Sequence, residues 1–306
     1  MNTVKSFDVI GLGAVTIDDF IYVQSYPPPD AKVPVLRSQR QCGGLTGTAL
    51  VAASRLGARC AYAGVLGSDA LSTHVIQAME AEGIEMSSAL IRPGVYPIHS
   101  TIVVDETRHT RNIFADLSGG SGADDSAPDP ELLRSAKVLF VDHIGVPGMI
   151  RAAAICRSAA IPIVADFERD PGADFQQLLG LVDHLIISQD FARRFTGVSN
   201  AREAATCLWN DQRTVVVITC GSEGCWYLDS TGVRHQPAFP VATVDTTGCG
   251  DVFHGAYAAA LAEGQSLANR IRFATAAAAL KATERGGQLG IPRRNVLDAF
   301  LTNHST

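Results

Sequence analysis

Apolar positions along this chain follow two spacings, and the change from one to the other predicts the fold. From Phe7 onward, short runs of β-branched and apolar residues are followed by longer segments with helical spacing. This order is expected of βαβ units, in which a mostly parallel sheet is covered by helices on both faces. Buried strands are predicted at residues 8–12, 60–65, 138–142, 163–166, 184–187 and 215–219, and helices at 48–56, 72–82, 149–159 and 201–210.

Two stretches, residues 20–41 and 98–114, break this alternation because they are rich in strand-forming residues and contain no helix. They are predicted to pair as a small antiparallel sheet that projects from the main body. Residues 116–130 consist largely of Gly, Ser, Asp and Pro, which predicts an exposed loop. The chain has no internal repeat, and its 306 residues fit one large α/β domain or two small ones.

Composition narrows the classes of function. The formal net charge is -6, with 46% hydrophobic and 18% charged residues. Without a basic excess, we expect no nucleic-acid partner and no attraction to an anionic membrane. The N-terminus has no signal-peptide core, and no later run is apolar enough to span a bilayer. The 7 cysteines form no CxxC pair or repeating framework, which predicts a reducing cytoplasm.

The segment VDTTGCGDVFHGAYAAALAEG carries the candidate chemistry, because a glycine-rich turn leads directly into a predicted helix. The N–H groups of Gly248, Cys249 and Gly250 would lie unpaired at the helix N-terminus, where the helix dipole also favours an anion such as phosphate. Asp251 is placed to accept a proton from a hydroxyl that attacks a phosphoryl group held there. Alternatively, Asp251 and Thr247 only cap the helix.

The surrounding sequence favours the first interpretation. DTTGCGDVFHGA resembles the C-terminal signature of the ribokinase-like, or pfkB, carbohydrate kinases. GGLTGTALVAASRLGA with GVLGSD resembles the N-terminal signature region of that family, and TCGSEG and AAAALKATERGGQLGIP resemble its nucleotide-binding segments. The resemblance extends from about residue 7 to residue 301 and presents four motifs in the expected order. It implies an ATP-dependent sugar kinase that uses Mg²⁺.

The resemblance also implies the fold and the catalytic residues. It predicts a ribokinase-like doubly wound α/β domain over residues 1–306, with a β lid built from about 20–41 and 98–114. The residue matching Asp251 is the catalytic base of the family, and the amides of Gly248, Cys249 and Gly250 stabilise charge on the transferred phosphoryl group.

A monovalent cation is implied next to this anion hole. Asp245 and Thr247 match positions that often hold such an ion, and backbone near Gly286 completes the site. Activation by potassium is therefore predicted.

Two segments match the nucleotide site. Thr219, Gly221 and Gly224 match a TxGxxG turn along the nucleotide phosphates, where missing side chains let the backbone come close. The NxxE segment of the family, which helps to organise magnesium, here reads SQDF from Ser188. We still assign Ser188 to the ATP site, and either Asp190 replaces the lost glutamate or the nucleotide phosphates hold most of the magnesium.

The acceptor site is implied by a separate set of residues in the N-terminal half. Asp18 matches an acidic residue that binds sugar hydroxyls, and Asp19 beside it is expected to face solvent. Thr48 replaces an asparagine of the family, and its single hydroxyl bonds fewer groups than a carboxamide. The other assigned residues are Gly43 and Gly44, against which the sugar packs, and Lys32 and Arg111 in the lid.

Two further positions are candidates with weaker support. Asp142 and His143 end a predicted parallel strand, where open α/β sheets bind ligands, but no motif surrounds them. Cys249 replaces a small residue of the family in the anion hole. It is either a tolerated small side chain or a reactive thiol whose pKa is lowered at a helix N-terminus.

The choice of acceptor remains the open question. The segments PIHSTIVVDE and HTRN resemble ketohexokinases, and RHQPAFPVATVDTTGCGDVFHGA with GGQLGIP resembles sulfofructose kinases, so a ketose-like sugar is favoured. Ala115 and Ile144 stand where a sulfonate would need polar partners, which argues against sulfofructose. The alternatives are a nucleoside kinase and a catalytically silent sugar-binding relative. The family also predicts a homodimer that pairs through the β lid.

Two other nucleotide-binding classes fit the sequence poorly. Gly11 and Gly13 begin a Rossmann-like pattern, but Thr16 stands at its third glycine and no acidic ribose anchor follows at the right distance. The chain contains no Gly-Lys pair, so it has no Walker motif.

Overall fold

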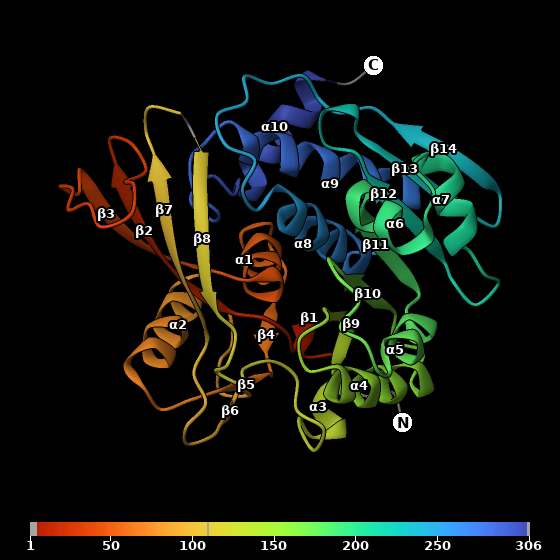
Figure 1. The fold of residues 1–306 in the computed structure, drawn as a ribbon. Helices are drawn as coiled ribbons and strands as arrows, with labels where there is room; N and C mark the ends of the chain where they lie inside the picture. Colours follow the sequence, from red (N-terminus) through yellow and green to blue (C-terminus); the bar gives the residue numbers. More distant parts are fainter. Residues whose placement is uncertain (1–4, 109, 305–306) are drawn as a thin grey trace.

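A computed structural model of the protein describes residues 5–108 and 110–304, and it contains one large sheet with a smaller sheet beside it (Figure 1). The strands of the large sheet from β12 to β4 run parallel, whereas β13 and β14 extend it antiparallel. In spatial order the strands are β14 (Gly232–Gln236), β13 (Cys225–Asp229), β12 (Val215–Thr219), β11 (His184–Ser188), β10 (Ile163–Asp166), β9 (Ala136–Val141), β1 (Phe7–Gly11) and β4 (Cys60–Tyr62).

The large sheet separates two apolar cores, because successive residues of a strand point to opposite faces. On β9, Val138 and Phe140 pack into one core, and Leu139 and Val141 pack into the other. Helices cover both faces, so the predicted doubly wound arrangement is confirmed. One core is closed by α1 (Leu45–Arg55), α2 (Ala70–Ala81), α8 (Cys249–Ala262), α9 (Leu267–Ala282) and α10 (Arg294–Asn303), and the other by α3 (Pro130–Arg134), α4 (Val146–Ser158), α5 (Phe175–Leu181), α6 (Gln189–Thr196) and α7 (Ala201–Leu208).

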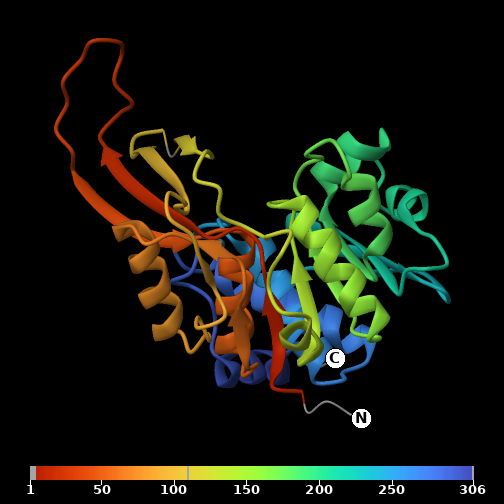
Figure 2. The same ribbon diagram turned by 90° about the horizontal axis from the view of Figure 1, so that it is seen from below.

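The lid is a second sheet with the order β3-β2-β7-β8. Its strands are β2 (Thr16–Val23), β3 (Arg37–Gly43), β7 (Ile98–Asp105) and β8 (Thr110–Asp116). The prediction of a purely antiparallel sheet was wrong for its central pair, because β2 and β7 run parallel. Helices α1 and α2 lie between these two strands in the chain, so β2 and β7 are not joined by a hairpin and are free to run in the same direction. The loop between β2 and β3 projects far from the body (Figure 2).

Some short elements complete the chain. Strand β5 (Val65–Leu66) pairs with β6 (Leu90–Ile91), and the 3₁₀ turn η1 (Gly221–Glu223) joins β12 to β13.

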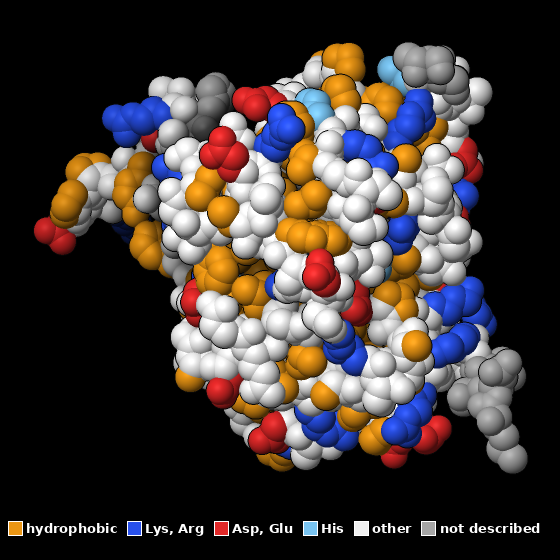
Figure 3. Space-filling view, turned by 90° about the vertical axis from the view of Figure 1, so that its right-hand side faces the viewer, with side chains coloured by type: hydrophobic (Ala, Val, Ile, Leu, Met, Phe, Trp, Pro, Cys, Tyr) orange, Lys and Arg blue, Asp and Glu red, His pale blue; other side chains and the backbone are white. Residues whose placement is uncertain are grey.

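No helix in residues 5–108 and 110–304 is long and apolar enough to cross a membrane. All 7 cysteines are free. On the face in Figure 3, acidic and basic side chains are intermixed with apolar ones.

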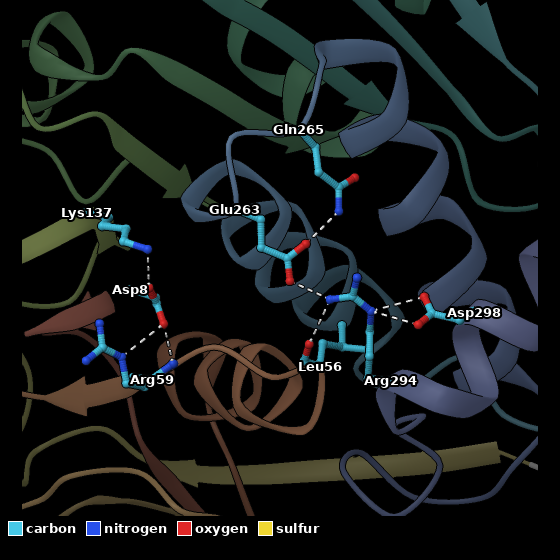
Figure 4. A network of polar contacts seen from close by, with 8 residues as sticks. All are labelled: Asp8, Leu56, Arg59, Lys137, Glu263, Gln265, Arg294 and Asp298. Atoms are coloured by element: carbon cyan, nitrogen blue, oxygen red, sulfur yellow. Dashed lines mark hydrogen bonds and ion pairs between the residues drawn. The ribbon is translucent and has the colours of Figure 1, made fainter. Parts of the chain in front are cut away.

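Ion pairs fix the C-terminal helix and the start of the sheet (Figure 4). The Arg294 side chain at the start of α10 contacts both carboxylate oxygens of Asp298 at 3.0 Å and also pairs with Glu263. At the opposite edge of the sheet from the carboxyl ends of the strands, Lys137 contacts Asp8 at 2.7 Å. Because Glu263 is the C-cap of α8, its ion pair with Arg294 joins the start of α10 to the end of α8.

Candidate active site

The carboxyl ends of the parallel strands meet at one edge of the large sheet, the edge at which open α/β sheets bind ligands. Here His143 follows β9, Asp166 ends β10, Ser188 ends β11 and Thr219 ends β12. Helix α8 begins at the same edge, since Asp251 in its first turn lines a cavity together with His143.

The start of α8 supplies free backbone donors. Gly248 caps the helix with a φ of 76°, in the left-handed region, and a Cβ atom there would lie 2.8 Å from the carbonyl oxygen of Gly287. The N–H groups of Gly248 and Gly250 have no acceptor among the described residues. The N–H of Cys249 donates to the carbonyl oxygen of Thr246 at 3.2 Å, so its expected place in the anion hole is corrected. Two of the three expected amides are free.

Asp251 faces a cavity of about 430 Å³ whose walls include Asp18, Gly44, Ile98, Leu117, His143 and Glu168. Burial raises the pKa of Asp251 well above its usual value, and the negative charges of Asp166, Glu168, Asp142 and Asp18 raise it further. A carboxylate with a raised pKa is a stronger base, so Asp251 is suited to accept a proton from a bound hydroxyl.

A buried histidine connects the first turn of α8 to the sheet. The Nε2 atom of His254 lies 2.9 Å from the carbonyl oxygen of Ile186, and Nδ1 lies 2.7 Å from that of Gly250. The carboxylate of Asp166 is 3.2 Å from the same Nδ1. Burial, with the nearby charges of Glu168 and Asp142, raises the pKa of Asp166 well above its usual value. Sequence reasoning missed this pair because its residues are 88 positions apart (254 − 166).

The predicted diglycine lies next to Asp18. A Cβ atom on Gly43 would be 2.6 Å from an Asp18 carboxylate oxygen, and one on Gly44 would be 2.5 Å from the carbonyl oxygen of Ala14. Gly44 also has a φ of 90°. The carboxylate of Asp18 accepts a hydrogen bond from the Thr16 hydroxyl at 3.2 Å and lines the cavity with Asp251. The structure therefore brings the expected acceptor residue and the expected base to one cavity.

Thr48 does not reach this cavity. Its side chain is only 2% exposed, and its hydroxyl accepts a hydrogen bond from the side-chain amide of Gln288 at 3.3 Å. Thr48 thus connects α1 to the segment between α9 and α10, and its part in binding the acceptor stays a prediction.

Of the two residues that end β9, one is structural and the other faces the cavity. The Asp142 carboxylate accepts hydrogen bonds from the N–H groups of Ala14 and Ile144 and from the Thr46 hydroxyl, at 2.6 to 2.8 Å. It therefore fixes the start of α1 to the sheet edge. His143 lines the cavity, and its buried Nδ1 atom has no hydrogen-bond partner among the described residues. Burial lowers the pKa of His143 to about 4, so the ring is neutral and can either donate or accept.

The two basic lid residues lie away from the cavity. Lys32 is exposed in the projecting loop between β2 and β3. Arg111 is on β8 in the row of Tyr22, four residues along β2 from Asp18, or about 13 Å at the usual rise of a strand. Neither residue lines the cavity, so their part in binding the acceptor stays a prediction.

The predicted phosphate turn follows β12. Gly221 and Gly224 have φ values of 56° and 92°, and a Cβ atom on Gly224 would lie 2.0 Å from the carbonyl oxygen of Gln236. Thr219 and Ser188 are paired neighbours at the ends of β12 and β11. The turn thus presents bare backbone at the carboxyl end of β12.

The altered magnesium segment is engaged elsewhere. The Ser188 hydroxyl accepts from the N–H of Phe191 at 3.2 Å and caps α6. Asp190 is paired with Arg193 at 3.0 Å and with Arg194 on the exposed face of α6. Within the part of the chain that the structure describes, no three His, Cys, Asp or Glu side chains form a metal-binding group.

The expected cation site contains a lysine. Both carboxylate oxygens of Asp245 accept backbone N–H groups, from Thr247 and from Gly286, each at 2.9 Å. The carbonyl oxygen of Asp245 accepts a hydrogen bond from the ammonium of Lys281 at 2.8 Å. Asp245, Thr247 and Gly286 do lie together, but Gly286 presents an N–H group to the carboxylate.

The thiol of Cys249 is less acidic than an ordinary cysteine. Burial raises its pKa, and the positive charge of Lys281 only partly opposes this effect. The hypothesis of a reactive thiol at the helix N-terminus is therefore not supported, and Cys249 fits the interpretation as a tolerated small side chain.

Comparison with known proteins assigns a family to this site. The sequence model of the pfkB family of carbohydrate kinases matches residues 7–294. The chain is 27% identical to the ribokinase of Haemophilus influenzae, over 95% of this chain and 97% of that protein. It is 28% identical to the ribokinase of Bacillus subtilis, over 95% and 98%. The structure of Arabidopsis thaliana ribokinase complexed with ribose and ATP has the same fold, with a TM-score of 0.84 and 22% identity over 96% of this chain and 98% of that one.

Proposed function

The chain belongs to the pfkB family of carbohydrate kinases, and on that premise we propose that it transfers the γ-phosphoryl group of ATP to a hydroxyl of a small sugar, with Asp251 as the base. One observation carries this proposal. Asp251 lies in the first turn of α8, next to the free N–H groups of Gly248 and Gly250, and lines the same cavity as Asp18.

In the proposed reaction, Asp18 holds hydroxyls of the sugar, and Asp251 takes the proton from the hydroxyl whose oxygen attacks the γ-phosphorus. The new O–P bond forms on one side of the phosphorus while the bond to the bridging oxygen breaks on the other, which releases ADP. Charge on the phosphoryl oxygens is stabilised by the N–H groups of Gly248 and Gly250 and by the dipole of α8.

The nucleotide phosphates are proposed to lie along the turn from Thr219 to Gly224, where bare backbone at Gly221 and Gly224 permits close approach. Magnesium is the usual partner of ATP and neutralises part of its phosphate charge. Because Asp190 is paired with arginines, we propose that the phosphate oxygens and water supply most of the magnesium ligands.

We propose a ketose-like sugar as the first acceptor to test. The lid strands resemble those of ketohexokinases in sequence, and the cavity combines the polar side chains of Asp18 and His143 with the apolar walls of Ile98 and Leu117. Among the described residues that line it, none is Phe, Tyr or Trp, which favours a sugar over a nucleoside because a nucleobase is usually stacked on a large aromatic ring.

The test is a screen for ADP release with ATP and Mg²⁺ across ketoses, aldoses, sugar phosphates and nucleosides. We expect the highest kcat/KM with a ketose. A higher kcat/KM with an aldose would reject the preference for a ketose but would agree with a sugar kinase. A higher kcat/KM with a nucleoside would reject both the ketose preference and the sugar kinase activity. Background ADP release without acceptor is the control.

We further propose that two subunits pair through the lid. The face of the lid that carries Asp18 continues through Phe20, Ile102 and Ile113, and Ile113 is 55% exposed in the single chain. In such a dimer, Lys32 and Arg111 would contact the second subunit. Light scattering, which measures the molar mass in solution, tests whether the protein is a dimer.

We also propose a reducing, cytoplasmic location, which the free thiols of all 7 cysteines support.

A further inference from the structure

Lys281 is an unusual residue for the position it occupies. It lies in the last turn of α9, and its side chain is 0% exposed. The ammonium donates to the carbonyl oxygen of Asp245 at 2.8 Å and to that of Glu284 at 3.3 Å. Burying an ammonium costs free energy unless acceptors and opposite charges surround it. Carbonyl oxygens around a single positive charge are also the surroundings of a bound monovalent cation.

The charges around Lys281 belong to the catalytic turn. Burial lowers the pKa of Lys281, and the nearby carboxylates of Asp245 and Asp251 partly oppose this shift because they favour the charged ammonium. Asp245 is connected to both segments of the site, because its oxygens accept the N–H groups of Thr247 and Gly286. The lysine therefore links the turn before α8 to the segment after α9 and places one positive charge next to the anion hole.

A separate potassium ion does not fit these residues. An ion that shared the Asp245 carbonyl would lie close to the ammonium, and two positive charges at such a short distance repel each other. Gly286 presents an N–H group at this point, which repels a cation, and both Asp245 carboxylate oxygens already accept hydrogen bonds.

We propose that the ammonium of Lys281 is a built-in monovalent cation, and that it replaces the potassium ion predicted at Asp245, Thr247 and Gly286. This inference rests on the proposed kinase function. The charge is attached to the chain, so it is present at every potassium concentration. The enzyme is consequently independent of potassium.

The first experiment uses the unaltered protein and two readouts. ADP release and the melting temperature are measured in potassium chloride and in tetramethylammonium chloride at equal concentration. We expect kcat to agree within about twofold and the melting temperatures to coincide, because no ion binds the folded state. Activation of the unaltered enzyme by tenfold or more, or a clear rise of its melting temperature with potassium, would overturn the proposal.

Variants then test whether the charge is what matters. Lys281→Ala is expected to lower kcat roughly 10- to 100-fold without potassium, and potassium is expected to restore kcat several-fold and to raise the melting temperature. If Lys281→Ala does not fold, Lys281→Met keeps the buried stem without the charge and is expected to show the same loss of kcat. A full rate in either variant without potassium, or no response of folded Lys281→Ala to potassium, rejects the proposal.

Lys137→Ala is the matched control, because it removes a lysine charge paired with Asp8 at the far edge of the sheet (Figure 4). Lys137→Ala should show neither the loss of kcat without potassium nor the recovery of kcat when potassium is added. The melting temperatures also separate this inference from the kinase proposal. If potassium stabilises only Lys281→Ala but no acceptor is phosphorylated, the built-in cation stands and the proposed reaction fails.

Discussion

The sheet edge around Asp251 and the lid around Asp18 differ in how firmly their polar groups are held. At the edge, Asp142 accepts three hydrogen bonds and His254 contacts two carbonyl oxygens. In the lid, every residue of β8 is exposed, and Arg111 has no polar partner among the described residues. The polar groups around the proposed base are therefore held by other parts of the chain, whereas those of the outer lid strand are exposed to solvent.

The largest effect is expected at the sheet edge. Asp251→Asn keeps the shape of the side chain but removes the base, so kcat should fall about 10²- to 10⁴-fold. The melting temperature should not decrease, because the change removes a carboxylate from a cluster of acids that repel one another. Steady-state kinetics, ATP titration and thermal unfolding measure the three quantities.

ATP binding is the internal control for this variant, since the proposed phosphate turn does not include Asp251. A nearly normal kcat in Asp251→Asn would show that another group takes the proton.

A smaller effect is expected where the lid meets the cavity. Asp18→Asn weakens charged hydrogen bonds to the acceptor, which are worth about 1.5–3 kcal/mol, so kcat/KM for the sugar should fall roughly 10- to 100-fold. The KM for ATP should stay unchanged. Asp19→Asn is the matched control, because Asp19 points to the other face of the lid and pairs with Arg40 at 2.7 Å.

In Asp19→Asn, kcat/KM for the sugar should fall less than about fivefold, because exposed ion pairs contribute little free energy. Equal losses in the two variants would mean that the lid acts only through its general stability.

How much of the site the sequence could predict depends on whether a residue belongs to a local motif or is brought to the site by the fold. Asp251 and Asp18 were assigned because each belongs to a local motif, and the structure brings both side chains to one cavity. Thr48 was assigned from its place after the diglycine, whereas its hydrogen bond with Gln288 depends on the fold. His143 was weighed without a motif, and its place in the cavity depends on the meeting of strands that are far apart in sequence. Lys281 had no signal, because a lysine in an alanine-rich helix commonly faces solvent.

The pH dependence connects the two regions. A base must be deprotonated to act, and the pKa of Asp251 is raised by burial and by four neighbouring acids, so kcat/KM should fall about tenfold per unit as the pH drops below that raised value. The acidic limb, which is the part of the pH profile where kcat/KM falls with decreasing pH, should therefore lie closer to neutral pH than it would for an ordinary aspartate. Asp18→Asn removes one neighbouring charge and should move this limb to lower pH.

Asp19→Asn should leave the limb in place, since Asp19 is not among the acids that act on Asp251. A limb that does not move in Asp18→Asn would show that lid and base are electrostatically separate.

The smallest effect is expected at Arg111 in the outer part of the lid, which can be compared with Arg169, an exposed arginine that follows β10 in the large sheet. Arg169 lines the cavity and Arg111 does not, and neither guanidinium has a hydrogen bond or ion pair among the described residues. Arg111→Ala should change kcat/KM less than about twofold in a single subunit, whereas Arg169→Ala should change it more. If Arg111→Ala has the larger effect and that effect depends on protein concentration, Arg111 acts in the site of a paired subunit, because only a dimer brings its guanidinium close to an acceptor.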